Sequence, residues 1–431
     1  MKEILERLFG DFLERPIPEL TRRDALLNPL SGKALALVGM RRVGKTYLCY
    51  QRIGELLDSG IERERILYLN FEDDRLFGFS LSDFQITLDV FYAAAPEKKS
   101  SHCYFFFDEI QNVPNWERFV RRLIDTEEVS VIVTGSSAKL LSAEIATGLR
   151  GRSVDVEVFP FSFQEYLDHH AIQISHKQPI GARTRLLLNQ QAELYCRKGG
   201  LPELQKLPQD RAREVAQSYV DAVVLRDVIE RHGVSNVEAL RALLYQVLRE
   251  PATKLSIHKV YQDFKSRGLR VSKDDLYAFM RHLADAYLLF QLPLWTRSEK
   301  KRQVNPKKVY VIDNGILDGY STQMTADQGA FLENLVFITL RRRISELGYY
   351  ETRQGYEVDF VYGEAGRTVL VQAAWSLKNV RTREREIRAL LQADQELENC
   401  RKQIVTLDEE TTLEDGEIEV LPLWKFLGLE A

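Results

Sequence analysis

Continuous apolar segments alternate with amphipathic ones over the first 160 residues of the chain. Short apolar runs predict strands at 34–38, 66–70, 104–107, 129–134 and 155–160. Apolar positions recur at helical spacing across 47–57, between the first two runs. Strands that are apolar on both faces and separated by helices are typical of a parallel sheet covered on both sides. The pattern therefore predicts an α/β domain over 1–160, which begins with an amphipathic helix.

The middle of the chain changes to a helical pattern. Helical periodicity runs over 161–250, interrupted by a Gly-Gly-Leu-Pro segment, and predicts a helical lid. Short helices and two apolar strands, at 287–294 and 308–312, follow it. Helices that precede a β-hairpin with a basic tip predict a winged helix over 251–313.

The last part of the chain has the pattern of a second α/β unit. Residues from 314 to about 324 are predicted to be a linker, and a long helix follows at 325–347. A second helix is expected at 380–398. The expected strands lie at 349–353, 357–362, 367–373, 402–407 and 418–422. We therefore expect a small α/β domain over 314–431.

Composition and charge narrow the class of protein. The net charge is −4, so contact with nucleic acid must come from local basic patches and not from the global field. No apolar run approaches the roughly 20 residues that span a bilayer. The four cysteines are far apart and lack metal-ligand spacing. These features predict a cytoplasmic protein with no membrane partner.

The segment after the first strand matches the phosphate-binding loop pattern in full. Its glycines let the backbone curl so that N–H groups point at phosphates, its lysine faces the β- and γ-phosphates, and its threonine hydroxyl ligates Mg²⁺. A strand before the loop and a helix after it supply the context that the pattern requires. We expect ATP and Mg²⁺ as cofactors, bound by Gly39, Met40, Arg41, Arg42, Val43, Gly44, Lys45 and Thr46.

Two acids follow a strand of four aromatic residues. This strand delivers Asp108 and Glu109 to the carboxyl edge of the sheet, where ligands of open α/β sheets bind. We expect Asp108 to hold Mg²⁺ through water and Glu109 to polarise the attacking water, with Lys45 completing the catalytic set. The alternative is that the two acids simply begin a loop.

Three more polar residues are candidates for the same reaction. Ser136 follows the strand at 129–134 and would place a hydroxyl near the γ-phosphate, with a polar turn as the alternative. Arg150 and Arg152 could stabilise the transition state on a nucleotide held by a neighbouring subunit. Such a role requires a head-to-tail homo-oligomer. A solvated basic loop explains the two arginines equally well.

Longer segments resemble those of prokaryotic AAA-type ATPases related to the archaeal-type ATPases. They include GMRRVGKT at 39–46, FFDEIQNVPNWE at 106–117, KGGLPE at 198–203 and VYVIDNGIL at 309–317. The similarity spans essentially the whole chain in the same order. It implies ATP binding, a winged-helix segment and a C-terminal fold similar to restriction-endonuclease-like nucleases. It implies no settled physiological role.

The resemblance also implies where the metal-binding residues of a nuclease would lie. Such nucleases need an acid on the first helix, an Asp on a strand and a Glu-x-Lys pattern on the next strand. Glu333 and Asp359 fit the first two positions, but Gln372 and Ala374 replace the last two. An amide is a poorer ligand than a carboxylate for a hard metal ion. We therefore expect a domain that does not cut DNA, with an active nuclease served by Lys378 as the rival hypothesis.

The basic stretch at 297–308 carries six Lys/Arg against one Glu. Such a stretch predicts contact with the phosphates of duplex or branched DNA, chiefly through Lys300, Lys301 and Arg302. The sequence thus predicts a Mg²⁺-dependent ATPase that acts as a switch or motor on DNA. The alternative is a regulatory or scaffolding NTPase whose C-terminal domain binds protein partners. Stimulation of turnover by DNA would distinguish the two.

Overall fold

A computed structural model describes residues 1–25, 27–28, 30–94, 101–135, 149, 151–174, 180–320 and 328–428. They form two compact units. The first unit is Met1–Phe159 with Asp285–Tyr287, and the second is Pro160–Ala284 with Leu288–Ala431. The finer division at 250 and 313 stays a prediction. Among the described helices, none is both long and apolar enough to cross a membrane.

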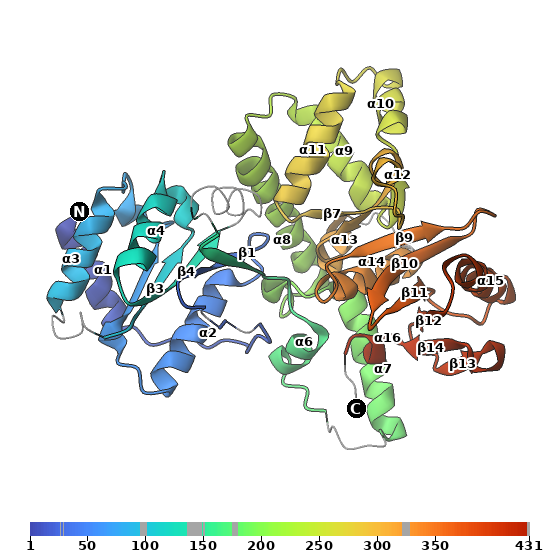
Figure 1. Cartoon of the computed structure of the whole chain (residues 1–431), viewed down its shortest axis with the longest axis horizontal. Helices are drawn as coiled ribbons and strands as arrows, with labels where there is room; N and C mark the ends of the chain where they lie inside the picture. Colours follow the sequence, from blue (N-terminus) through green and yellow to red (C-terminus); the bar gives the residue numbers. More distant parts are fainter. Residues whose placement is uncertain are drawn as a thin grey trace. The chain divides into compact units, whose positions relative to one another are not determined.

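The first unit is a five-stranded parallel sheet in the order β2-β3-β4-β1-β5. Figure 1 labels its three middle strands, β3, β4 and β1. Its strands are β1 (Ala34–Val38), β2 (Ile66–Asn70), β3 (Cys103–Asp108), β4 (Val129–Gly135) and β5 (Ser153–Glu157). Its helices are α1 (Lys2–Glu14), α2 (Lys45–Asp58), α3 (Asp83–Ala94) and α4 (Trp116–Thr126). The predicted parallel α/β sheet is confirmed, although the last strand begins and ends earlier than expected.

The strand register of the first unit brings the carboxyl ends of four strands to one edge of the sheet. Val38 of β1 pairs with Gly135 of β4, and Asn70 of β2 pairs with Asp108 of β3. The middle of the sheet is held by burial, because every residue of β1 is buried and β3 contributes three buried phenylalanines. In β3, an apolar strand in the middle of the sheet, the acidic residue Asp108 therefore lies at the strand end.

The second unit begins with helices and ends with a larger sheet. The helices are α6 (Phe163–His169), α7 (Ala182–Lys198), α8 (Gln209–Ala222), α9 (Val237–Arg249), α10 (Ile257–Ser266), α11 (Lys273–Asp285), α12 (Glu299–Val304), α13 (Asn314–Tyr320), α14 (Gln328–Arg341), α15 (Val380–Leu397) and α16 (Leu423–Phe426), with a π-helical stretch at Val223–Glu230. A small antiparallel sheet has the order β6-β8-β7, built from β6 (Thr253–Leu255), β7 (Leu289–Leu292) and β8 (Lys307–Val311).

The C-terminal sheet is mixed and has the order β13-β14-β12-β11-β10-β9. Its strands are β9 (Leu347–Glu351), β10 (Glu357–Glu364), β11 (Arg367–Ala373), β12 (Cys400–Thr406), β13 (Thr411–Leu413) and β14 (Ile418–Pro422). β9, β10 and β11 form an antiparallel meander, and α15 then connects β11 to the parallel strand β12 (Figure 1). A nuclease-like character of this sheet stays a prediction.

The basic stretch between β7 and β8 is not the simple hairpin tip that the sequence suggested. It contains the helix α12, whose first turn is capped by the Ser298 hydroxyl accepting from the backbone N–H of Lys301 at 3.4 Å. A serine before a run of helix-forming residues favours this short helix over a turn.

The small sheet packs into the C-terminal domain. The ring of Tyr310, on β8, stacks on that of Phe337, on α14, with centroids 4.1 Å apart. The backbone N–H of Trp295 donates to Tyr349 O on β9 at 2.6 Å. Residues on either side of the expected linker therefore share one hydrophobic core.

The predicted linker at 314–324 was wrong for its first seven residues, which form the helix α13. The carboxylate before it, Asp313, accepts from the backbone N–H groups of Gly200, at 2.6 Å, and Gly315, at 2.8 Å. A Cβ at Gly200 would meet Phe161 O at 2.3 Å. The close approach thus requires glycine, and the Asp-Asn-Gly segment that resembles a loop is a buried junction between distant helices.

We expect Asp313→Ala to destabilise the second unit by about 2–4 kcal/mol, because two buried N–H groups lose their acceptor. Urea unfolding followed by circular dichroism measures the change. Asp318→Ala is the matched control, since Asp318 pairs with Arg213 in a half-exposed ion pair worth about 1 kcal/mol or less. A loss in Asp313→Ala no larger than in Asp318→Ala would contradict this account.

The same carboxylate predicts a pH effect. Burial raises the pKa of Asp313 from its usual 3.8 to about 6. The folded state therefore holds this proton more tightly than the unfolded state, and the contribution to stability is lost as pH rises from about 4 through 6. Asp313→Asn should remove this part of the pH dependence.

Candidate nucleotide site

The loop between β1 and α2 has the curled backbone that the sequence predicted. Gly39 and Gly44 have φ values of 154° and 102°, and the non-glycine Arg42 also lies in the left-handed region at 68°. A Cβ at Gly39 would meet Val158 O at 2.4 Å. Both the backbone angle and the close approach therefore require glycine at this position.

Lys45 is placed inside this loop. It is the first residue of α2, its side chain is 4% exposed, and its Nζ donates to the carbonyls of Gly39 and Met40 at 3.1 Å each. The same ammonium lies 3.9 Å from Glu109 Oε1. A buried cation at a helix N-terminus, within the curled loop, suits an anionic phosphate.

Asp108 ends β3 and is fully buried. One of its carboxylate oxygens accepts from Thr46 Oγ1 at 2.8 Å and from the Tyr68 hydroxyl at 2.9 Å, and the other accepts from the Thr134 hydroxyl. Burial raises the pKa of Asp108, and these hydrogen bonds oppose that rise. The hydroxyl of Thr46 and this carboxylate together supply the two oxygen groups that a Mg²⁺ ion at a phosphate loop requires. The residues therefore fit the ion.

Glu109 is held from several sides. Its backbone, at φ 52°, is left-handed, and its N–H donates to Thr134 Oγ1 at 2.9 Å. Its Oε2 accepts from Gln111 Nε2 at 2.5 Å, while Oε1 faces Lys45. The structure thus gathers Lys45, Thr46, Asp108 and Glu109, and a carboxylate at this place can orient a water molecule.

A cavity of about 400 Å³ adjoins Thr46. Its lining includes the aromatic residues Phe12, Tyr47, Tyr50 and Tyr68. Its volume falls within the range of small-molecule sites.

The remaining candidates of the first unit are less informative. Ser136 and Arg150 lie outside the described residues. Arg152 Nε pairs with Asp125 Oδ1, on α4, at 2.9 Å. Action of the two arginines on a neighbouring subunit stays a prediction.

Arg23 is a residue that sequence reasoning missed. It precedes β1, is buried, and its guanidinium donates to Val43 O at 2.9 Å and to Phe159 O at 2.6 Å. Its backbone N–H donates to Gln51 Oε1 on α2 at 2.7 Å. Arg23 thereby fixes the phosphate loop, but the neighbouring Arg22 is exposed, and no local signal separates the two.

The candidate residues of the C-terminal domain come together with an unexpected lysine. Lys308 Nζ lies 2.5 Å from Glu333 Oε1 and 3.0 Å from Asp359 Oδ1. Gln372 Oε1 accepts from the backbone N–H of Asp359 at 2.8 Å. Lys378, the lysine weighed from the sequence, is exposed. Lys308 was counted with the basic stretch, yet its side chain is only 3% exposed.

The DNA-binding candidates lie on α12. Lys300 and Lys301 are exposed, and Arg302 NH1 lies 3.8 Å from Glu299 Oε1.

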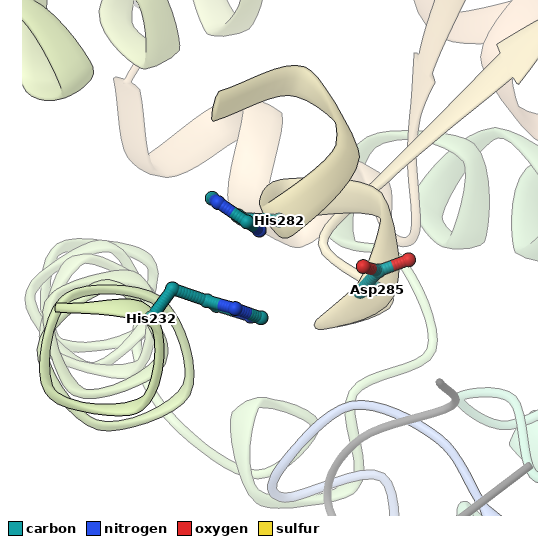
Figure 2. Close-up of side chains that lie close together, drawn as sticks. All are labelled: His232, His282 and Asp285. Atoms are coloured by element: carbon teal, nitrogen blue, oxygen red, sulfur yellow. The ribbon is translucent and has the colours of Figure 1, made fainter. Parts of the chain in front are cut away.

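Figure 2 shows a separate feature of the structure, a pair of histidines that stack on one another. The rings of His232 and His282 stack with centroids 3.7 Å apart, and Asp285 ends the helix α11 that carries His282.

The parallel sheet, the curled loop and the acids at its edge define an AAA-type P-loop domain. Residues 31–167 match the family described as an AAA domain, whereas 189–327 and 328–426 match two domains of unknown function, DUF8612 and DUF4143. The chain belongs to the family of AAA-domain proteins that carry a C-terminal DUF4143 domain.

Two relatives are uncharacterized proteins. The one from Methanocaldococcus jannaschii is 34% identical over 441 residues, which cover 99% of this chain and 95% of that protein. The one from Haemophilus influenzae is 28% identical over 342 residues, covering 79% of this chain and 82% of that protein.

Among solved structures, the chain is similar to the ORC1 protein of Aeropyrum pernix in complex with DNA. The identity is 13%, the TM-score is 0.31, and the match covers 74% of this chain and 91% of that chain. For the ADP form of the ORC2 protein from the same organism, the identity is 12%, the TM-score is 0.34, and the coverage is 67% and 86%.

We expect Lys45→Ala and Glu109→Gln to separate binding from hydrolysis. Lys45→Ala should weaken ATP binding about 10–100-fold, because a charge-assisted contact to phosphate is lost. Glu109→Gln should bind ATP normally and hydrolyse it about 100-fold more slowly. Isothermal titration with Mg²⁺–ATP and a phosphate-release assay measure the two effects. Unchanged turnover in Glu109→Gln would remove this residue from the reaction.

Arg23→Ala should loosen the phosphate loop, because two carbonyls lose a buried donor. We expect the first unit to be destabilised by about 2–4 kcal/mol and ATP binding to weaken with it. Thermal unfolding with and without ATP measures both. Arg22→Ala is the matched control and should behave like the wild type. Equal behaviour of the two variants would show that Arg23 has no such role.

Proposed function

We propose that this protein is a Mg²⁺-dependent ATPase that acts as a switch or motor on DNA. The hydrogen bond of 2.8 Å between Thr46 Oγ1 and Asp108 Oδ2, beside the buried ammonium of Lys45, carries the proposal. A hydroxyl, a carboxylate and a lysine at the mouth of a curled loop are the groups that phosphoryl transfer to water needs.

Each residue has a distinct role in this proposal. Thr46 and Asp108 hold Mg²⁺, which neutralises charge on the β- and γ-phosphates when bound. Lys45 exchanges its two carbonyl partners for phosphate oxygens. Glu109, kept in place by Gln111 and by the hydroxyl of Thr134, orients the attacking water. Arg150 or Arg152 of a neighbouring copy in a homo-oligomer supplies the remaining positive charge.

The elements α9 to β8 support an action on DNA. The helix α9, the short strand β6, the helices α10 and α11, and the antiparallel strands β7 and β8 with α12 between them follow one another along the chain. This order supports a winged helix, a fold related to the helix-turn-helix readers of DNA. Its exposed α12 presents Lys300 and Lys301. In this proposal the C-terminal domain binds DNA without cutting it.

ATPase turnover with and without DNA tests the proposal. We expect single-stranded, duplex or branched DNA to raise the rate of phosphate release by the full chain. Turnover that no form of DNA alters would favour the alternative, a scaffolding NTPase whose C-terminal domain binds protein partners.

Neutralising Lys300, Lys301 and Arg302 with glutamine should weaken DNA binding about equally for all sequences. The slope of log affinity against log salt should fall by about three, because about three phosphate contacts are lost. Fluorescence anisotropy at several salt concentrations measures the slope. Exposed Lys206 and Arg211, changed to glutamine, serve as the control. An unchanged slope in the triple variant would show that α12 does not contact DNA.

A further inference from the structure

The acid cluster of the C-terminal domain already contains a cation. Lys308, on β8, places its Nζ at 2.5 Å from Glu333 Oε1, 2.8 Å from Glu357 Oε1 and 3.0 Å from Asp359 Oδ1. An ammonium group has three N–H donors. All three are matched by carboxylate oxygens from two different elements, α14 and β10.

Two of these carboxylates, those of Glu333 and Asp359, are the ones that would hold a metal ion in a nuclease-like site. Glu357 and Asp359 are two residues apart on β10, so they share a face of the sheet. Asp359 Oδ2 also accepts from the backbone N–H of Ala373 at 3.0 Å, which fixes the carboxylate. Lys308 therefore lies at the point where the acids converge.

Gln372, at the position expected for a third metal ligand, makes hydrogen bonds to other groups of the protein. Gln372 Nε2 donates to Glu357 O at 2.9 Å and to Glu386 Oε2 at 2.8 Å. Glu386 in turn pairs with Arg385 at 2.6 Å. The amide thus uses its donors on backbone and carboxylate oxygens, and this hydrogen-bond network does not leave a ligand set suited to a divalent ion.

A second lysine contacts the same group of carboxylates. Lys254 Nζ lies 2.6 Å from Glu357 Oε2, on the other oxygen of the carboxylate that Lys308 contacts. Lys254 also pairs with Glu351 Oε2 at 2.9 Å. A divalent ion would have to compete with two ammonium groups for these carboxylates.

We propose that Lys308 is the resident cation of this cluster, held where a divalent metal would otherwise bind. The wild-type chain takes no divalent metal at Glu333 and Asp359, and the cluster becomes a divalent-cation site only when the lysine is removed. Because Lys308 directly follows the segment that contains α12, this cation also anchors the basic helix to the C-terminal domain. The proposal is independent of ATP hydrolysis.

Mn²⁺ binding to the nucleotide-free full chain, followed by the EPR signal of free Mn²⁺, tests this proposal. The wild type and Asp359→Asn should take up the same amount of Mn²⁺. Lys308→Ala should bind an additional Mn²⁺ ion per chain, and Lys308→Ala/Asp359→Asn should lose it. Lys254→Ala is the matched control, since it removes a lysine from the same Glu357 without vacating the centre of the cluster, and it should gain no ion.

The melting temperature gives a second readout, because an ion that binds only the folded state stabilises that state. The melting temperature of Lys308→Ala should fall by several degrees and rise again with Mn²⁺, whereas that of the wild type should not respond at this site. Mn²⁺ uptake by the wild type that Asp359→Asn abolishes would overturn the proposal, and so would a folded Lys308→Ala that gains no ion. If Lys308→Ala does not fold, the comparison of the wild type with Asp359→Asn decides.

Discussion

The nucleotide site depends on one buried carboxylate, that of Asp108. A buried carboxylate is costly unless hydrogen bonds compensate it, and here three hydroxyls do so, from Thr46 on α2, Tyr68 on β2 and Thr134 on β4. Each hydroxyl comes from a different element, so the same interaction fixes the helix after the phosphate loop and both neighbours of β3. The parallel strand order brings these groups to one edge. Lys45 and Glu109 can then face one another across the loop.

In the second unit, two more buried charged groups are compensated by partners from distant segments of the chain. Asp313 is buried between backbone N–H groups of two helical segments more than a hundred residues apart in sequence. Lys308 is buried among three carboxylates. Removing one partner from such a site leaves an uncompensated buried group, which costs more than an exposed ion pair contributes. These contacts therefore define which distant segments must pack together.

The local parts of this structure could be predicted from the sequence. The strands of the first unit and the phosphate loop are encoded by short apolar runs and by glycine spacing, which need no distant partner. Arg23, Asp313 and Lys308 could not be assigned in this way, because their partners lie from about twenty to more than a hundred residues away. The pairing of Glu357 with Asp359 on one face of a strand was the signal available for the acid cluster.

The central claim is that Thr46, Asp108 and Glu109 form a site for hydrolysis of Mg²⁺–ATP. Its most direct test is phosphate release by the purified wild-type chain, measured with Mg²⁺ and again with EDTA, while ATP binding is monitored in both conditions. The account predicts steady release that requires Mg²⁺. Tight ATP binding with no Mg²⁺-dependent release of phosphate would contradict it.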